Sequence, residues 1–203
     1  MAPQFIIGID EVGRGPIAGP LCVGACMIQQ KDRRVFSNVV RGIRDSKQLS
    51  PQKREQWNRV LFGAQEQGIC SVRTVMVSEK VIDTKGLTFA LRFAIKRVLH
   101  LLKVDPRVCE VLLDGGIKAP LVFPFQKTII KGDEKIPLIG AASIVAKVRR
   151  DRYMVQVSKR YPQYGFERHK GYGTREHYMA LRKQGISKVH RRSFLKKLIT
   201  NNV

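Results

Sequence analysis

Acidic side chains directly follow two separate apolar segments of this sequence. Asp10 and Glu11 end the first run, and Asp114 ends a later one. A partly buried carboxylate is costly unless it is paired or binds a metal ion. If the two runs are neighbouring strands that end at one sheet edge, Asp10 and Asp114 repel each other unless a cation lies between them. Carboxylate oxygens suit Mg²⁺ or Mn²⁺, so the sequence predicts a divalent-metal site. The alternative is that each acid caps its strand or pairs with a local cation such as Arg14.

A fourth acid, Asp151, lies on a segment with helical spacing. Gly140, Ser143, Lys147 and Asp151 fall on one stripe, at positions i, i+3, i+7 and i+11. Small residues at the start of this helix allow close approach to a sheet, so we expect Asp151 to project toward the other acids. The alternative is an exposed acid that offsets the neighbouring arginines.

Other residues that could carry chemistry favour simpler interpretations. Asp133 and Glu134 are expected in a solvated turn. The four cysteines lack C-x-x-C spacing and clustered histidines, which favours reduced core residues over a zinc site. The glycine-rich segment 13–19 contains prolines and precedes a strand, which disfavours a dinucleotide site, and no G-x-x-x-x-G-K motif indicates an NTPase. Three histidines are expected to be hydrogen-bonded or solvated: His169, His177 and His190.

Hydrophobic patterning predicts the elements that must position these side chains. Apolar runs bounded by turn residues predict strands over 5–10, 21–28, 69–77, 108–114 and 121–130, the last interrupted by Pro124. Helical spacing and N-cap residues predict helices over about 51–67, 79–102, 138–160 and 174–184. Strands come first and then alternate with helices, which indicates an α/β fold with a mixed sheet. We expect residues 1–203 to form one domain, in which 161–203 is a basic helical C-terminal extension.

Charge indicates the class of partner. The 203 residues include 38 Lys and Arg against 16 Asp and Glu, a formal net charge of +22. A hydrophobic content of 43% is enough for a sizeable core and excludes a disordered basic tail. Such a protein usually binds a polyanion, with nucleic acid the first candidate and an anionic membrane the second. Because residues 147–197 carry 16 basic and 3 acidic side chains, we expect the main polyanion surface at the C-terminal face.

Targeting signals are not recognisable in the sequence. No apolar stretch approaches the ~20 residues of a membrane helix, and the first residues lack the basic region of a signal peptide. We therefore expect a cytoplasmic protein, in agreement with the reduced cysteines.

Seven short sequence blocks follow one another along the chain. They are GIDEVGRGP (8–16), DSKQLS (45–50), KGD (131–133), AASIVAKVRRDR (141–152), YGF (164–166), HKGYGT (169–174) and HRRSF (190–194). With these blocks, from residue 8 to residue 194, the chain resembles one enzyme family, the bacterial ribonuclease HII or type 2 ribonuclease H. One short motif is weak evidence, whereas seven ordered blocks are specific.

The resemblance implies a ribonuclease H-like fold and four metal-ligating acids, matched here by Asp10, Glu11, Asp114 and Asp151. It also implies endonucleolytic cleavage of RNA in RNA/DNA hybrids and of single ribonucleotides embedded in duplex DNA. We predict a two-metal reaction, with Mg²⁺ or Mn²⁺, that leaves 5′-phosphate and 3′-hydroxyl products. Asp10 and Asp114 would bridge the two ions, and the other two acids would complete one ion each.

The resemblance also assigns the recognition of substrate. In the family, the Gly-Arg-Gly loop and the tyrosine of the Gly-Tyr-Gly segment recognise the ribonucleotide and its junction with DNA. The matching residues here are Gly13, Arg14, Gly15 and Tyr172. Glycine has no Cβ, so its backbone can approach the 2′-hydroxyl that separates RNA from DNA. Lys47 is a further candidate phosphate contact.

Related families and other functions remain as alternatives. Type 3 enzymes carry an additional N-terminal domain and typically Lys at the position of Arg14, so we expect the type 2 enzyme, acting as a monomer. The sequence departs from the family pattern at Gly116, at Arg149 and over 84–87, positions that bear on substrate preference. A non-catalytic basic nucleic-acid binder would explain the charge but not the four acids. A nuclease of the same broad fold that acts on DNA junctions is the third possibility.

Overall fold

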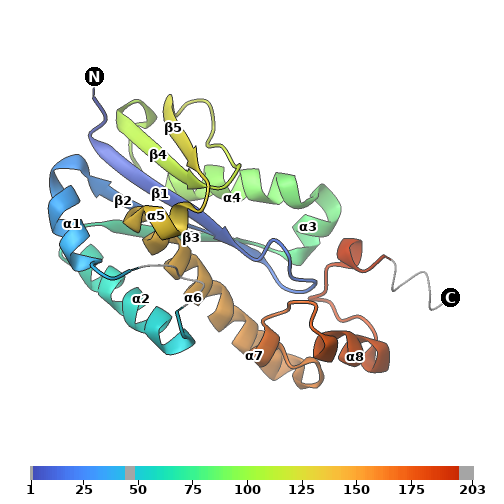
Figure 1. The fold of residues 1–203 in the computed structure, drawn as a ribbon. Helices are drawn as coiled ribbons and strands as arrows, with labels where there is room; N and C mark the ends of the chain where they lie inside the picture. Colours follow the sequence, from blue (N-terminus) through green and yellow to red (C-terminus); the bar gives the residue numbers. More distant parts are fainter. Residues whose placement is uncertain (1, 44–48, 197–203) are drawn as a thin grey trace.

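A mixed five-stranded sheet with helices on both faces forms the centre of the molecule (Figure 1). The computed structural model describes residues 2–43 and 49–196. The spatial order of the strands is β3-β2-β1-β4-β5. Antiparallel pairing joins β1 to β2 and β2 to β3, whereas β4 runs parallel to both β1 and β5. The strands are β1 (Phe5–Val12), β2 (Leu21–Gln29), β3 (Ser71–Val77), β4 (Cys109–Asp114) and β5 (Phe125–Ile129).

One face of the sheet packs against α3 (Glu79–Lys85) and α4 (Leu87–Leu101). The Ser78 side chain caps α3 by accepting a hydrogen bond from the backbone of Val81. The prediction of one continuous helix over 79–102 was wrong in one respect, because Gly86 adopts a φ of +85° and separates the two helices. The apolar side chains that recur at helical spacing along α4 are buried against the sheet: Ala90, Leu91, Ala94, Ile95 and Val98.

The opposite face packs against α6 (Pro137–Arg160), with α1 (Arg33–Val39) and α2 (Pro51–Glu66) beside it. Helix α6 lies directly on the strands because two of their residues are glycines. A Cβ on Gly8 of β1 would come within 2.5 Å of the Leu138 backbone, and a Cβ on Gly24 of β2 would overlap the Ala142 carbonyl oxygen. The close approach expected from the small residues of α6 is therefore confirmed.

The C-terminal segment packs against the second half of α6 and against residues 17 and 18 (Figure 1). It contains α7 (Phe166–His169) and α8 (Arg175–Gln184), joined by loops. The described part of the expected helical extension is thus only partly helical. The described residues also form four short 3₁₀ helices: η1 (Gln30–Asp32), η2 (Pro106–Val108), η3 (Pro162–Tyr164) and η4 (Arg192–Phe194).

Residues 121–135 correct two further predictions. The strand expected over 121–130 begins only after Pro124, which cannot donate a hydrogen bond to a neighbouring strand. The short helix α5 (Gly132–Lys135) follows it, and within α5 the Asp133 side chain is 1% exposed. The expectation of a solvated turn was therefore wrong for the buried Asp133, whereas Glu134 is exposed as expected but lies in α5 and not in a turn.

The prediction for the cysteines agrees with the structure. All four cysteines are free and buried, as predicted for reduced core residues: Cys22, Cys26, Cys70 and Cys109. Within residues 2–43 and 49–196, no helix is both long and apolar enough to cross a membrane.

Candidate active site

Three of the four predicted acids line one cleft of about 310 Å³ at the C-terminal ends of β1 and β4. The parallel pairing of these strands sets Ile9 beside Leu113, so the next residue of each strand, Asp10 and Asp114, emerges at the same edge. The remaining lining comes from the loop after β1, from α6 and from the C-terminal segment. The residues are Asp10, Glu11, Val12, Gly13, Arg14, Gly15, Asp114, Ser143, Lys147 and Tyr172.

Asp10 is the most enclosed acid of the cleft, with 3% of the residue exposed. Burial raises the pKa of its carboxyl to about 7, and the nearby Glu11 and Asp114 charges add to this rise. Two hydrogen bonds oppose it, one from the Ser143 hydroxyl and one of 2.7 Å from the Glu11 backbone to Oδ1. Asp10 is therefore an acid whose ionised form an added cation would stabilise.

Glu11 and Asp114 each have one oxygen engaged by a donor from the protein. Arg14 Nη1 lies 3.2 Å from Glu11 Oε1, and the Gly132 backbone donates to Asp114 Oδ1 over 2.7 Å. The Arg14 side chain is 55% exposed, so its guanidinium lies at the mouth of the cleft. These contacts orient both carboxylates while the cleft stays open.

Asp151 does not line the cleft of the other three acids. It lines a neighbouring pocket, where Lys147 donates to its Oδ1 over 2.8 Å and Arg54 Nη2 lies 3.9 Å from its Oδ2. Lys147 lines the carboxylate cleft and also donates a hydrogen bond to Asp151. The helical stripe thus brings Ser143 and Lys147 to the cleft, and Asp151 is linked to it through Lys147.

Two buried arginines hold the loop that follows β1. Arg191 donates from Nε to the Gly19 carbonyl, from Nη1 to that of Arg14 and from Nη2 to that of Gly13, over 2.9, 3.1 and 2.7 Å. Arg150 donates to the carbonyls of residues 18, 20 and 170. Both side chains are fully buried, and desolvation lowers the pKa of Arg191 to about 10, so it stays charged at neutral pH.

Tyr172 projects into the cleft from the C-terminal segment and is 40% exposed. The Arg150 guanidinium carbon lies 5.8 Å from the centre of its ring. Behind it, the neighbouring Gly171 accepts hydrogen bonds from the backbone of residues 17 and 18. Tyr172 is therefore positioned by Arg150 and by residues 17 and 18 of the loop after β1.

A histidine pair fixes the backbone of Tyr172. His177 Nδ1 lies 2.8 Å from the Tyr172 carbonyl, which can only accept, so Nδ1 carries the proton. His177 Nε2 must then accept from His190 Nε2, 2.9 Å away, and His190 Nδ1 accepts from the Ser187 backbone over 3.0 Å. One neutral arrangement satisfies every nitrogen, and burial lowers the pKa of each ring to about 4. This confirms the expected hydrogen-bonding role of both histidines.

The sequence interpretation missed the two buried arginines. Arg150 and Arg191 lie in a segment rich in basic residues, where each looks like one more solvated cation. Their occurrence inside two of the ordered blocks was the available signal. Lys47, the expected phosphate contact, lies outside the described residues.

The cleft suits a hard divalent ion, because its candidate ligands are carboxylate oxygens. The raised pKa of the enclosed Asp10 carboxyl points the same way, since a nearby cation favours the charged form. Within the described residues, no three Asp, Glu, His or Cys side chains already have the spacing of a metal site. The carboxylate oxygens are suitable ligands for such an ion, and the carboxylates must move closer together to bind it.

Comparisons with known proteins agree with one another. The family model described as ribonuclease HII matches residues 7–197. Ribonuclease HII from Caldicellulosiruptor bescii is 43% identical over 197 residues, which cover 97% of this chain and 89% of that protein. Ribonuclease HII from Geobacillus kaustophilus is 43% identical over 189 residues, covering 93% of this chain and 67% of that protein.

Solved structures show the same architecture. A chain of the PCNA:RNase HII complex from Archaeoglobus fulgidus matches with a TM-score of 0.73 at 25% identity, covering 92% of this chain and 93% of that one. Ribonuclease H2 from Pyrococcus horikoshii OT3 matches with a TM-score of 0.72 at 25% identity, covering 97% and 98%. Bst-RNase HIII in complex with Mn²⁺ shares the fold, with a TM-score of 0.65 at 17% identity over 95% of this chain and 65% of that one. The expected fold class is confirmed.

Proposed function

Because this chain belongs to the ribonuclease HII family and is a ribonuclease H hydrolase, we propose that it cleaves RNA in RNA/DNA hybrids and cleaves 5′ of ribonucleotides embedded in duplex DNA. The observation that carries the proposal is the convergence of Asp10, Glu11 and Asp114 in one cleft of a protein with a net charge of +22. The cationic surface attracts the nucleic acid, and the enclosed carboxylates supply the selective chemistry.

Asp10, Glu11 and Asp114 are the side chains that would hold Mg²⁺ or Mn²⁺ in this cleft. Asp151 would join them by exchanging its hydrogen bond with Lys147 for an ion. When bound, two such ions activate a water molecule and stabilise charge on the departing 3′-oxygen, which gives 5′-phosphate and 3′-hydroxyl products. The Mn²⁺ complex of Bst-RNase HIII, a protein of the same fold, supports the choice of ions.

The chain's own groups position the substrate around these acids. Ser143 and the Glu11 backbone orient the Asp10 carboxylate, and Lys147 keeps a positive charge beside the cleft for a phosphate. The backbone of residues 13–15 and the exposed Tyr172 ring face the same space, where they would read the 2′-hydroxyl and stack on the adjacent sugar or base. Arg14, at the mouth of the cleft, would release its hydrogen bond to Glu11 and bind the substrate instead.

Cleavage assays on three duplexes test the proposal: an RNA/DNA hybrid, duplex DNA with one ribonucleotide, and the same duplex as DNA alone. We expect cleavage of the first two with Mg²⁺ or Mn²⁺ and none of the third. Asp10→Asn and Asp114→Asn should each lower turnover at least a thousandfold, because an amide is a poor ligand for these ions, with hybrid affinity changed less than about threefold.

The matched control is Asp32→Asn, which removes one acid outside the cleft and should leave turnover unchanged. Near-normal turnover of Asp10→Asn or Asp114→Asn would contradict the metal assignment. Equal cleavage of the DNA-only duplex would favour the junction nuclease, and binding without cleavage of any duplex would favour the non-catalytic binder.

We also propose that the enzyme works as a monomer in the cytoplasm. The free, buried cysteines agree with a reducing compartment. Sedimentation of the active enzyme at assay concentration should give a mass near 23 kDa, whereas about twice that mass would contradict the monomer.

A further inference from the structure

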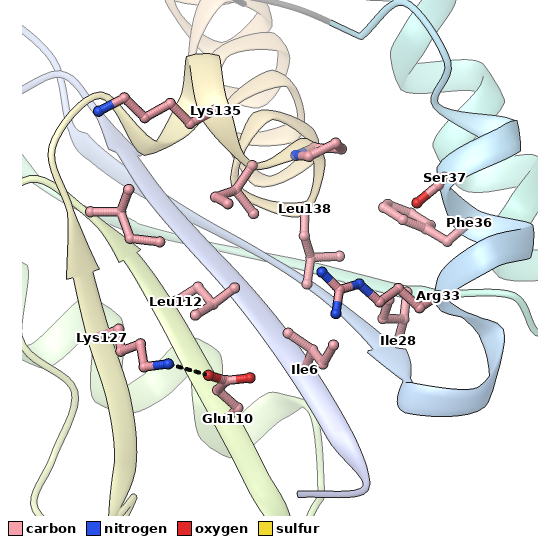
Figure 2. Close-up of a pocket in the computed structure, with 13 residues that line it drawn as sticks. Ile6, Ile28, Arg33, Phe36, Ser37, Glu110, Leu112, Lys127, Lys135 and Leu138 are labelled. Atoms are coloured by element: carbon pink, nitrogen blue, oxygen red, sulfur yellow. Dashed lines mark ion pairs between the residues drawn. The ribbon is translucent and has the colours of Figure 1, made fainter.

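A second cavity, of about 510 Å³, lies toward the opposite end of β1 from the carboxylate cleft (Figure 2). Ile6 lines it and precedes Asp10 by four residues, which places the two about 13 Å apart along the strand. The cavity is bounded by β4 and β5, by α1 and by the start of α6. We call it the distal groove, and none of its lining residues belongs to the carboxylate cleft.

The floor of the distal groove is apolar because α6 covers only part of this sheet face. Along β4, Val111 and Leu113 point to the α4 side and are fully buried, whereas Leu112 points to the α6 side and is only half-buried. Ile6 and Leu138 lie beside Leu112 in the groove (Figure 2). A volume of this size holds two or three side chains, within the range of ~300–1,000 Å³ usual for ligand sites.

The rim of the distal groove carries three cations and one acid. Lys127 lies 3.4 Å from Glu110, and Lys135 donates to the Ile130 carbonyl over 2.9 Å. The exposed Arg33 side chain extends over the floor beside Ile28 (Figure 2). Among the residues that the structure describes, no carboxylate pairs with the Arg33 guanidinium. The rim therefore has a net positive charge and one cation available to an incoming anion.

We propose that the distal groove docks an acidic segment of a partner protein that anchors itself with a bulky apolar side chain. The apolar floor takes the anchor, and Arg33 with the two lysines binds the flanking carboxylates. Nucleic acid fits less well, because its phosphates gain nothing from an apolar floor. A second copy of this chain lacks the complementary segment, since its acids never occur more than two in a row.

The neighbouring segment supports a protein partner. The chain around β5 exposes four large apolar side chains within ten residues, with Leu121 94% and Ile130 76% exposed. Strand β5 is also an edge of the sheet, so one side of its backbone is open to pairing. Apolar exposure beside an open strand edge is typical of a surface that a protein covers.

Fluorescence anisotropy with a labelled octapeptide tests the proposal. The peptide carries Phe and Leu at its centre and three acidic residues on each side. We expect micromolar binding to the full-length protein, and at least tenfold weaker binding by Arg33→Glu. Arg34→Glu is the matched control, because this exposed neighbour in α1 makes the same charge change and does not line the groove. It should alter binding less than twofold, and both variants should keep normal ribonuclease activity.

A second peptide, with Ser in place of Phe and Leu, separates docking from charge attraction. We expect it to lose at least tenfold in affinity, and methyl NMR with the first peptide should shift Ile6 and Leu112. Excess RNA/DNA hybrid should not displace the first peptide. Equal losses in Arg33→Glu and Arg34→Glu, equal binding of the two peptides, or displacement by the hybrid would each overturn the proposal.

Discussion

Gly13 and Gly15 stand on either side of Arg14, but their surroundings differ. Gly13 adopts a φ of +93°, and a Cβ there would overlap the Arg150 side chain. A Cβ on Gly15 would meet no atom within 4 Å. The folded protein therefore requires glycine at position 13, whereas the reason for glycine at position 15 must lie outside the free protein. Close approach of the substrate backbone is the reason that the proposed function supplies.

We predict that Gly15→Ala lowers activity on a single embedded ribonucleotide at least tenfold with a change in melting temperature below about 1 °C. Gly13→Ala should lower both the activity and the melting temperature, because alanine at this position is strained and displaces Arg150. Thermal unfolding and kinetics on one embedded ribonucleotide check the pair. If Gly15→Ala cleaves that substrate at the wild-type rate, the backbone of this residue does not contact the ribonucleotide.

Several elements meet where the loop after β1 contacts the C-terminal segment. Arg191 reaches three carbonyl oxygens of that loop, and the Arg191 backbone itself donates to the Ile17 carbonyl over 2.8 Å. These bonds join residues more than 170 positions apart in the sequence. The C-terminal segment thus positions the Gly-Arg-Gly loop in addition to contributing Tyr172.

We predict that Arg191→Lys destabilises the protein by about 3 kcal/mol, because an ammonium group cannot reach three carbonyls that a guanidinium satisfies. It should also raise KM more than it lowers kcat, since the proposed function assigns substrate binding to this loop and the substitution leaves the acids untouched. Urea unfolding and steady-state kinetics measure both. Arg192→Lys is the control, because Arg192 is exposed and only its backbone bonds to Asp83. Similar losses for both variants would contradict the positioning role.

The buried histidine pair makes this region sensitive to acid. Both rings have a pKa of about 4 in the folded protein against an ordinary value of 6.5, so the unfolded chain takes up protons first as pH falls. The stability contributed by the neutral pair is complete above pH 6.5 and is lost as the pH falls toward 4. Protonation of His177 would also set two N–H donors against each other at the contact with His190.

We predict that the free energy of unfolding falls between pH 7.5 and pH 5 by about 2 kcal/mol for each ring and about 4 kcal/mol for the pair, at about 1.4 kcal/mol per pKa unit. His177→Gln should remove roughly half of that dependence, because glutamine does not titrate and His190 remains. His100→Gln, at an exposed position of α4, should leave it unchanged. Urea unfolding at the two pH values measures each slope, and equal slopes for wild type and His177→Gln would refute the prediction.

Across the whole molecule, positive charge is abundant and acids are few. Of the 16 acidic residues, three line one cleft, and Asp151 lies with Glu55 in the adjoining pocket. The C-terminal segment that holds Tyr172 also carries a large share of the basic residues. A duplex attracted to that segment would therefore lie close to both the carboxylates and the Gly-Arg-Gly loop.

We predict that hybrid affinity falls steeply with salt and that C-terminal charges contribute directly to the slope. The double variant Arg182→Glu with Lys183→Glu, both exposed in α8, should reduce the slope of log Kd against log salt by about 2 or more. The same charge reversal at Lys31 and Arg34, which are exposed in or near α1, should change this slope by less than about 1. Equal effects at the two places would mean that substrate does not favour the C-terminal face.

The sequence by itself determined the strands, most helices and the family. It also singled out four acids as candidate metal ligands. Periodicity of 2 or 3.6 residues follows from local backbone geometry, so Ser50 and Pro51 were enough to place the start of α2. Short motifs keep their order along the chain whatever the packing is. The acids at strand ends stood out because a buried carboxylate is costly in any fold.

Only the tertiary structure decided how distant residues combine. The parallel pairing of β1 with β4 brought Asp10 to Asp114, whereas one helical turn of separation linked Asp151 to Lys147. Arg191 and Asp133 look solvated in sequence, and both are buried. Burial of a polar side chain depends on which elements cover it, and so does the open floor of the distal groove. Local sequence carries no record of such contacts, because packing between remote segments creates them.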